Sequence, residues 1–162
     1  MHMYPVGIKP KPFISYDTSD SNFAELLYYE FSRRGYDSFF APKSIAPMEN
    51  WKSAVNKNLL GCWPFVMLLS NAALNSEFAT YERNIASFFN KLSVVVQLEN
   101  CQIPTGHDKY QCFTLTEDGQ IPSNEICEFL DDQWNIVPKI ANLNHRPNWS
   151  AFPSHPNYSA FI

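Results

Sequence analysis

The sequence predicts an α/β fold, with a parallel sheet covered by helices on both faces. Residues 65–69 form an entirely apolar run and residues 92–98 a mostly apolar one, which is typical of strands buried on both faces. Segments with helical spacing of apolar residues alternate with these short runs. Because parallel strands need right-handed crossovers, the alternation predicts a doubly wound sheet of five strands.

The individual elements follow from local patterns. We expect strands at residues 13–16, 37–40, 65–69, 92–98 and 112–115. We expect helices at residues 22–34, 51–60, 76–89 and 124–140, the last one ended or kinked by Pro138. Asp20 or Ser21 can cap the first helix, and Gly35 can end it. Pro42 and Pro47 predict a loop over residues 41–50, because a helix interior does not accommodate proline.

Size and charge limit the domain organisation and the partners. The 162 residues suffice for one domain with a core, and we assign residues 11–141 to it, with an N-terminal extension at 1–10. Residues 142–162 are rich in proline, asparagine and aromatics, so we expect this tail to pack on its own domain or on a neighbour. The net charge of −4 argues against a nucleic acid or an anionic membrane as the main partner.

The expected environment of the chain is the cytoplasm. Residues 1–12 hold three prolines and no apolar segment typical of a signal peptide, and the run 65–69 is far too short to cross a bilayer. The four cysteines form no CxxC pair, so we expect reduced thiols and no metal site. The scattered histidines support no Ser-His-Asp or Cys-His triad, and the isolated glycines form no phosphate-binding loop.

Two segments carry the candidate site. Glu82 lies one helical turn after the aromatic Phe78, and the end of the first strand carries the polar residues Ser15, Tyr16, Asp17 and Asp20. Ligands of open α/β sheets bind where strand carboxyl ends meet helix amino ends. If the two segments are adjacent, Glu82 faces a crevice. The alternatives are a solvated Glu82, a core Phe78 and an Asp20 that only caps a helix.

Several segments resemble the TIR domain family in their residues, their order and their spacing along the chain. The resemblance rests on residues 13–16 with the loop 17–20, residues 34–40 with the long loop 45–51, and residues 65–70 with 74–78. It covers the chain from Lys11 to about Ile140 and implies a five-stranded parallel flavodoxin-like sheet. The tail after Asn142 lies outside the family pattern.

The resemblance also implies an activity. Many prokaryotic TIR domains cleave the nicotinamide–ribose bond of NAD with a glutamate four residues after an aromatic, often Trp; here these positions are Glu82 and Phe78. Phenylalanine keeps a stacking face but lacks the indole N–H donor. Glu82 is then the catalytic residue, and Glu77 is dispensable. The implied substrate-binding residues are Ser15, Tyr16, Asp17, Asp20, Lys43, Trp51 and Phe78.

This chemistry needs one well-placed carboxylate. Cleavage builds oxocarbenium character on the ribose, and nicotinamide leaves as a neutral molecule, so no general acid is required. A carboxylate near the ribose stabilises the positive charge. We expect Glu82 to stay ionised near the positive end of its helix.

The resemblance leaves two main functions open. The first is an NAD glycohydrolase or ADP-ribosyl cyclase. Such an enzyme needs no cofactor, since NAD is the substrate. Its product would be a signal read by a separate effector protein, as in Thoeris-type anti-phage defence. Self-association through TIR–TIR contacts would then involve residues 42–51. The alternative is a non-enzymatic TIR adaptor acting through the same contacts. A third option, an effector that mimics host TIR domains, needs a secretion route that the sequence does not show.

Overall fold

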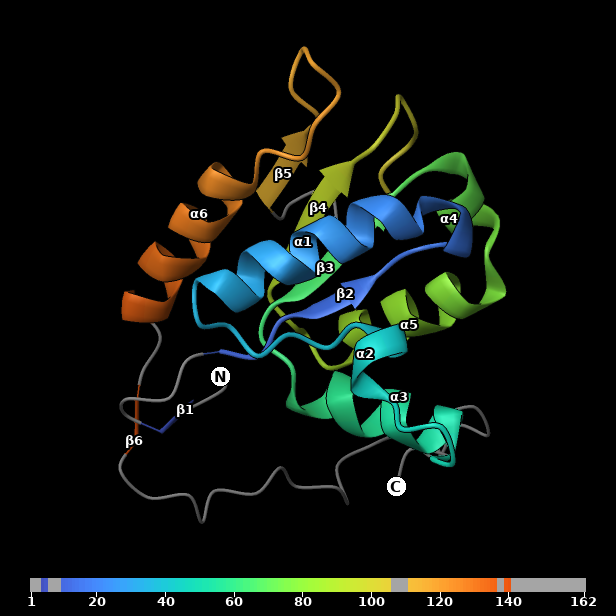
Figure 1. Ribbon diagram of the computed structural model, residues 1–162, viewed down its shortest axis with the longest axis vertical. Helices are drawn as coiled ribbons and strands as arrows, with labels where there is room; N and C mark the ends of the chain where they lie inside the picture. The colour runs from blue at the N-terminus through green and yellow to red at the C-terminus, as the bar shows by residue number, and fades with distance from the viewer. Residues whose placement is uncertain (1–3, 6–9, 106–110, 137–138, 141–162) are drawn as a thin grey trace.

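A parallel four-stranded sheet forms the centre of the domain. The computed structural model describes residues 4–5, 10–105, 111–136 and 139–140. Within them, the sheet has the order β2-β3-β4-β5 and is parallel throughout (Figure 1). Its strands are β2 (Phe13–Ser15), β3 (Phe65–Leu69), β4 (Ser93–Gln97) and β5 (Gln111–Thr114). A separate parallel pair joins β1 (Tyr4–Pro5) to β6 (Lys139–Ile140).

Helices cover both faces of the sheet. One face carries α1 (Ser21–Arg33) and α6 (Ser123–Ile136), and the other carries α3 (Trp51–Gly61) and α5 (Glu77–Phe88) (Figure 1). Three short elements complete the described part: η1 (Thr18–Asp20), α2 (Ala41–Ser44) and α4 (Asn71–Asn75). This arrangement confirms the predicted α/β fold with a parallel sheet.

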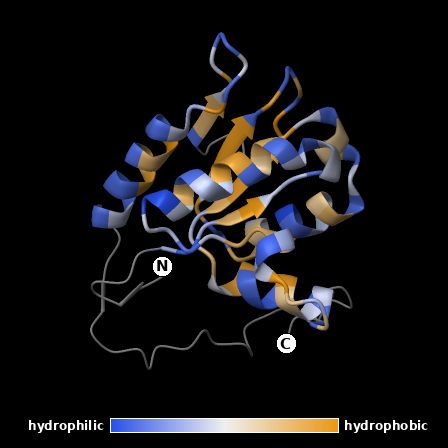
Figure 2. Ribbon diagram, in the orientation of Figure 1, coloured by the Kyte–Doolittle hydropathy of each residue, from blue (hydrophilic) through white to orange (hydrophobic). Residues whose placement is uncertain are grey.

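The core has two halves because successive strand residues point to opposite faces. Ile14, Val66 and Val94 pack under α1 and α6, whereas Phe13 and Phe65 pack under α3 and α5. All five residues of β3 are buried, as its continuous apolar run predicts. Figure 2 shows the hydrophobic colouring concentrated on the strands, while the helices carry one apolar and one polar side.

The prediction of five strands is wrong by one. Residues 37–40 form no strand; Phe39 makes only an isolated parallel bridge to Phe13, with Phe39 N donating to Pro12 O at 2.7 Å and Ile14 N donating to Phe39 O at 3.0 Å. The pairing cannot extend, because α2 begins at Ala41 and Pro12 has no amide hydrogen to donate. Phe39 still marks the position of an edge strand beside β2.

The structure contains two short helices that the sequence patterns do not predict. The expected loop 41–50 begins with α2, which accepts Pro42 because its first turn needs no backbone donor there. A short helix, α4, was missed before α5; the side chains of Ser70 and Ser76 cap the starts of α4 and α5. The predicted last helix, 124–140, is too long, because Lys139–Ile140 form the strand β6. The other strands and helices agree with the prediction to within a few residues. Pro138 and the tail 142–162 lie outside the described residues.

Candidate active site

A cavity of about 380 Å³ opens at the carboxyl end of β2, between this strand and the helices α3 and α5. Its size is that of small-molecule sites. Polar and aromatic side chains line it together with an apolar floor. The lining residues are Ile14, Tyr16, Asp17, Thr18, Phe39, Ala41, Trp51, Val55, Ser76, Phe78 and Glu82. Four of the predicted substrate-binding residues, Tyr16, Asp17, Trp51 and Phe78, therefore meet the predicted catalytic Glu82.

Glu82 projects from the second turn of α5 toward the end of β2. The hydroxyl of Ser15, the last residue of β2, donates a hydrogen bond of 2.9 Å to Glu82 Oε1. Ser15 is buried and is not one of the residues that line the cavity. The structure therefore places Ser15 behind Glu82, where it orients the carboxyl group.

Burial raises the pKa of Glu82 to about 8, while the Ser15 hydrogen bond and the neighbouring Arg83 oppose that shift. The expectation of an ionised Glu82 is therefore wrong for the free protein near neutral pH. Desolvation outweighs the helix dipole, because Glu82 is beyond the first turn, where the dipole acts most strongly. A carboxyl group with a strongly raised pKa in a cavity is typical of functional sites.

The loop after β2 supplies two further ionisable groups of the wall, Tyr16 and Asp17. Asp17 accepts hydrogen bonds from the Ser19 hydroxyl at 2.5 Å and from Ser19 N at 2.9 Å, and these bonds lower its pKa. Burial, and secondarily the charges of Glu82 and Glu25, raise the pKa of Tyr16 to about 12. The cavity thus combines a protonated phenol and a fixed carboxylate with the titratable Glu82.

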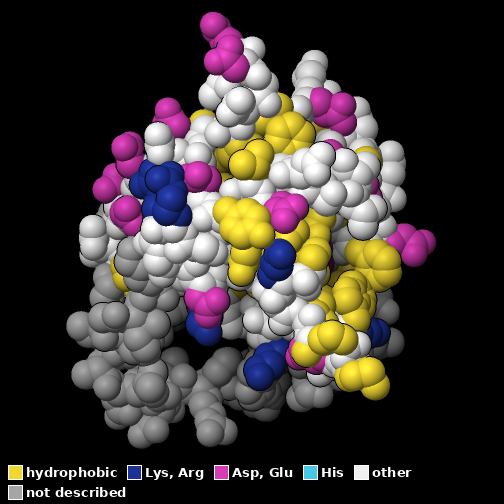
Figure 3. Space-filling model, in the orientation of Figure 1, with side chains coloured by type: hydrophobic (Ala, Val, Ile, Leu, Met, Phe, Trp, Pro, Cys, Tyr) yellow, Lys and Arg dark blue, Asp and Glu magenta, His cyan; other side chains and the backbone are white. Residues whose placement is uncertain are grey.

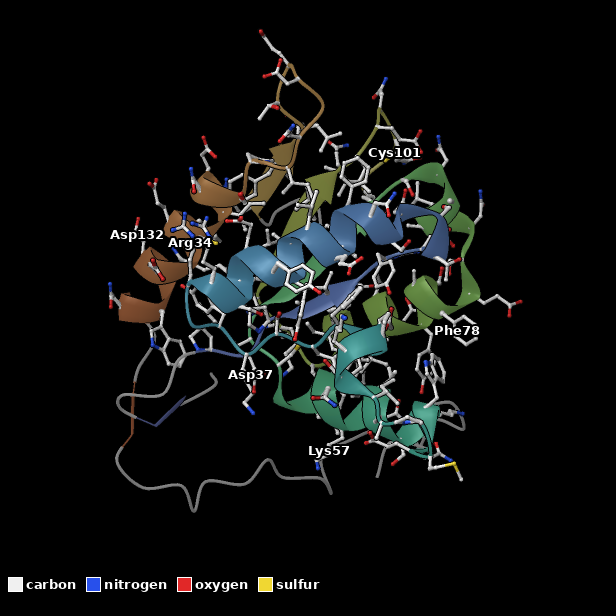
Figure 4. The ribbon with its side chains drawn as sticks, in the orientation of Figure 1. Arg34, Asp37, Lys57, Phe78, Cys101 and Asp132 are labelled. Carbon is white, nitrogen blue, oxygen red and sulfur yellow. The ribbon has the colours of Figure 1, made fainter. Side chains whose placement is uncertain are left out.

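Two aromatic side chains form the rim of the cavity. The rings of Trp51 and Phe78 meet edge to face, with centroids 4.7 Å apart at 72°. Phe78 remains 62% exposed and Trp51 40% exposed, so neither is a core residue. Figure 4 shows Phe78 at the outer side of α5, beside α3. Both rings are available to contact a flat ligand.

Several lining residues are not among the predicted site residues. Ser76 is predicted only as the start of a helix. Its capping position before α5 places it at the helix amino end, where ligands of such sheets bind. Thr18 adjoins the predicted loop residues, and the apolar wall of Ile14, Phe39 and Val55 has no local signal. Behind the site, buried Arg83 donates to Ala73 O at 3.1 Å and to Thr80 Oγ1 at 2.8 Å, which joins α4 to α5.

Besides Ser15, two predicted substrate-binding residues do not line this cavity. Asp20 makes no capping hydrogen bond to α1; its carboxylate instead accepts one of 2.5 Å from Ser70 Oγ, at the end of β3. Lys43 lines a different cavity, described below. Glu77, in the first turn of α5, is exposed and also outside the cavity.

Other kinds of site find no support in the described part of the chain. No group of three or more His, Cys, Asp or Glu side chains there could hold a metal ion. All four cysteines are free thiols. None of the helices within the described ranges is both long and apolar enough to cross a membrane.

The fold and the cavity together define an open parallel α/β domain with a cavity at the carboxyl edge of its sheet, which is where ligands of such domains commonly bind. The chain belongs to the TIR domain family: the family model matches residues 13–130. A search of curated proteins finds none that matches.

Solved structures show the same fold. The TIR domain of the Toll-related receptor TRR-2 from Hydra magnipapillata superposes with a TM-score of 0.58 at 11% identity, covering 79% of this chain and 97% of that one. A TIR-STING receptor from C. gigas, solved in complex with 2′,3′-cGAMP, gives a TM-score of 0.55 at 20% identity. That match covers 78% of this chain and 42% of the receptor. At these identities the likeness concerns the fold alone.

Proposed function

We propose that the protein cleaves the nicotinamide–ribose bond of NAD, as a glycohydrolase or an ADP-ribosyl cyclase, with Glu82 as the catalytic residue. The observation that carries the proposal is the position of Glu82: its carboxyl group lies in the cavity at the sheet's carboxyl edge, held by Ser15 and flanked by two exposed aromatic rings. The sequence resemblance to NAD-cleaving prokaryotic TIR domains supports the same assignment.

The raised pKa of Glu82 fits this chemistry. Near neutral pH the free cavity holds a largely protonated Glu82. Bound NAD brings a cationic nicotinamide ring, and its charge favours the ionised carboxylate. As the bond breaks, positive charge moves onto the ribose, and the ionised Glu82 stabilises it electrostatically. Asp17, whose hydrogen bonds with Ser19 lower its pKa, supplies a second negative charge in the same wall.

The aromatic rim and the polar wall supply the remaining contacts in this proposal. Trp51 and Phe78 stack on the flat rings of the dinucleotide, and the Tyr16 hydroxyl donates to a ribose or phosphate oxygen. Self-association through TIR–TIR contacts brings the exposed segment before α3 of one copy to the rim of another. Met48, which is 96% exposed, is the most prominent residue of that segment.

In the cell, the product acts as an ADP-ribose-derived signal read by a separate effector protein in anti-phage defence. The resemblance to stand-alone prokaryotic TIR proteins supports this biological role. The chemical proposal does not depend on it.

Product analysis of concentrated purified protein incubated with NAD tests the proposal. Glu82→Gln keeps the size of the side chain but removes its charge, so nicotinamide release is expected to fall by at least about a thousandfold. Glu77→Gln is the matched control, since Glu77 is exposed on the same helix and outside the cavity. It is expected to retain activity. The co-product identifies the reaction as hydrolysis or cyclisation.

Two results would contradict the proposal. Equal losses of nicotinamide release in Glu82→Gln and Glu77→Gln would contradict the assignment of Glu82 as the catalytic residue. No turnover by a protein shown to be assembled would favour an adaptor that acts only through TIR–TIR contacts.

A further inference from the structure

A second cavity, of about 400 Å³, lies at the opposite end of β2 from the Glu82 cavity. It is bounded by α1, by the segment from Asp37 to α2, and by α3. The lining residues are Lys11, Tyr28, Asp37, Ser38, Phe39, Lys43, Ser44, Lys57, Asn58 and Gly61. Figure 4 labels Asp37 and Lys57 on this side of the molecule, projecting from the segment after α1 and from α3.

The walls of this basic cavity carry a local positive charge. Lys11, Lys43 and Lys57 come from three different segments. Among the described lining residues Asp37 is the one carboxylate, so their formal charge is +2. The whole chain, in contrast, carries −4. The cavity is therefore locally positive although the net charge of the chain is negative. A cavity with this charge attracts anions.

Two of the three ammonium groups have no acidic partner in the described part of the chain. Lys11 Nζ lies 3.4 Å from Asp37 Oδ2, but both side chains are well exposed, so this pair contributes little. Within the described residues, no carboxylate oxygen lies within 4.0 Å of Lys43 or Lys57. Lys43 Nζ instead lies 6.0 Å from the centre of the Tyr29 ring. In Figure 3, Lys or Arg side chains are visible between the regions of α1 and α3.

Hydroxyl groups add donors to the same wall. Ser38 is 4% exposed, and its Oγ makes no hydrogen bond to any described residue, which is costly for a buried polar atom. Ser44 Oγ accepts a hydrogen bond of 2.9 Å from Phe40 N, so its own hydrogen can be donated. Unused hydroxyl donors beside unpaired ammonium groups match the acceptor oxygens of a phosphate.

The structure separates this cavity from the Glu82 cavity. Of the residues that the structure describes, Phe39 alone lines both cavities, and no charged side chain is shared among them. The rings of Tyr28 and Phe39 give the basic cavity an apolar wall beside its charges. Its volume is that of a small-molecule site, not that of a single water or chloride ion.

We propose that the basic cavity is a second ligand site, distinct from the Glu82 cavity, that binds a phosphate-bearing small molecule. Lys43 and Lys57 contact the phosphate oxygens, Ser38 and Ser44 donate hydrogen bonds to them, and the organic part packs against Tyr28 and Phe39. This proposal does not depend on NAD cleavage.

Calorimetric titration with inorganic pyrophosphate, at constant ionic strength, tests the site. Lys57→Gln and Lys43→Gln are each expected to weaken binding by about threefold to tenfold, and the double variant by more. Lys52→Gln is the matched control, because Lys52 is on the same helix but outside the cavity. It should bind like the unchanged protein, and so should Glu82→Gln, which alters only the other cavity.

Ser38→Ala provides a second, independent readout. Removing an unpartnered buried hydroxyl should leave thermal stability unchanged or slightly raised, while pyrophosphate affinity falls. This combination distinguishes a ligand contact from a structural role.

Three results would overturn the proposal. The first is the absence of saturable binding up to about 10 mM pyrophosphate. The second is equal affinity in the Lys57→Gln, Lys43→Gln and Lys52→Gln variants. The third is tighter binding by Glu82→Gln with no loss in the lysine variants, which would place the pyrophosphate in the Glu82 cavity.

Discussion

Ser15 Oγ donates a hydrogen bond of 2.9 Å to Glu82 Oε1, linking two residues 67 positions apart in the sequence. Ser15 ends β2, and Glu82 lies in the second turn of α5, so the bond fixes the helix to the carboxyl edge of the sheet. A donor to a carboxylate favours its ionised form. Ser15 therefore lowers the pKa of a group whose burial raises it.

Replacing Ser15 with alanine tests this relationship. The loss of one hydrogen bond of about 1 kcal/mol should raise the pKa of Glu82 by roughly half a unit to one unit above its value of about 8. Because the ionised form is the active one in the proposed reaction, kcat/KM should rise with pH up to the pKa of the free enzyme. In Ser15→Ala the rising limb should move to higher pH.

The control for this prediction is Ser87→Ala, which removes an exposed hydroxyl from the last turn of the same helix. Its pH profile should match that of the unchanged protein. Unchanged profiles in both variants would show that Ser15 does not influence the ionisation of Glu82.

Glu82→Gln should make the protein more stable at high pH. The folded-state pKa of about 8 lies above the ordinary glutamate pKa of 4.5, so the folded protein binds more protons than the unfolded chain between these pH values. Stability therefore falls as pH rises through this window, and glutamine removes that loss. We expect an increase in the free energy of unfolding of about 1–3 kcal/mol at pH 8, shrinking toward zero near pH 4.5.

Urea unfolding of both proteins at several pH values measures this difference. Glu77→Gln, at an exposed position of the same helix, should not reproduce the pH-dependent gain. A constant offset between Glu82→Gln and the unchanged protein at all pH values would contradict a raised pKa for Glu82.

Most of the fold could be predicted because its signals are local. The apolar run Phe65–Leu69 could only be a strand buried on both faces, and Gly35, with a φ of 86°, ends α1 as glycine commonly does. The predicted strand at 37–40 failed because edge pairing depends on the partner segment. Pro12, on the neighbouring segment, lacks an amide hydrogen, and the start of α2 leaves only Phe39 in register.

The site was predictable to the extent that it follows from sheet topology and helix spacing. Tyr16 and Asp17 directly follow a strand, and Phe78 and Glu82 share a helix face, so their meeting follows from general rules. Lys43 and Ser15 lie elsewhere than predicted because their positions depend on packing. Lys43 lines the other cavity, and Ser15 is buried with its hydroxyl bound to Glu82. No local sequence pattern reveals either placement.

Trp51→Ala should weaken substrate binding more than it slows the chemical step. Its ring packs edge to face against Phe78 at the rim, so its removal costs stacking area and leaves the carboxyl group of Glu82 in place. We expect KM for NAD to rise by about tenfold with a smaller change in kcat. Phe78→Trp should retain activity, because it keeps the stacking face. A fall in kcat with an unchanged KM for Trp51→Ala would contradict this role.

Met48→Asp should lower activity through assembly. Met48 is 96% exposed and does not line the cavity, so the substitution leaves the site of a single copy intact. A charge at a self-association contact weakens that contact, and specific activity should therefore recover as protein concentration rises. Activity and sedimentation measured over the same concentration range test this. A loss independent of concentration would contradict a TIR–TIR contact at Met48.

Lys91→Met should destabilise the fold at the point where α3 ends. Lys91 is 2% exposed, and its Nζ donates to Leu60 O at 2.6 Å and to Cys62 O at 3.1 Å, satisfying carbonyls at the end of α3. Methionine preserves the length of the side chain but leaves these carbonyls without their donor, which should cost about 2–4 kcal/mol in urea unfolding with an unchanged m-value. Lys52→Met, on the exposed side of α3, should change stability by less than about 0.5 kcal/mol. Similar, small effects in both variants would show that the ammonium group of Lys91 is not required to satisfy the end of this helix.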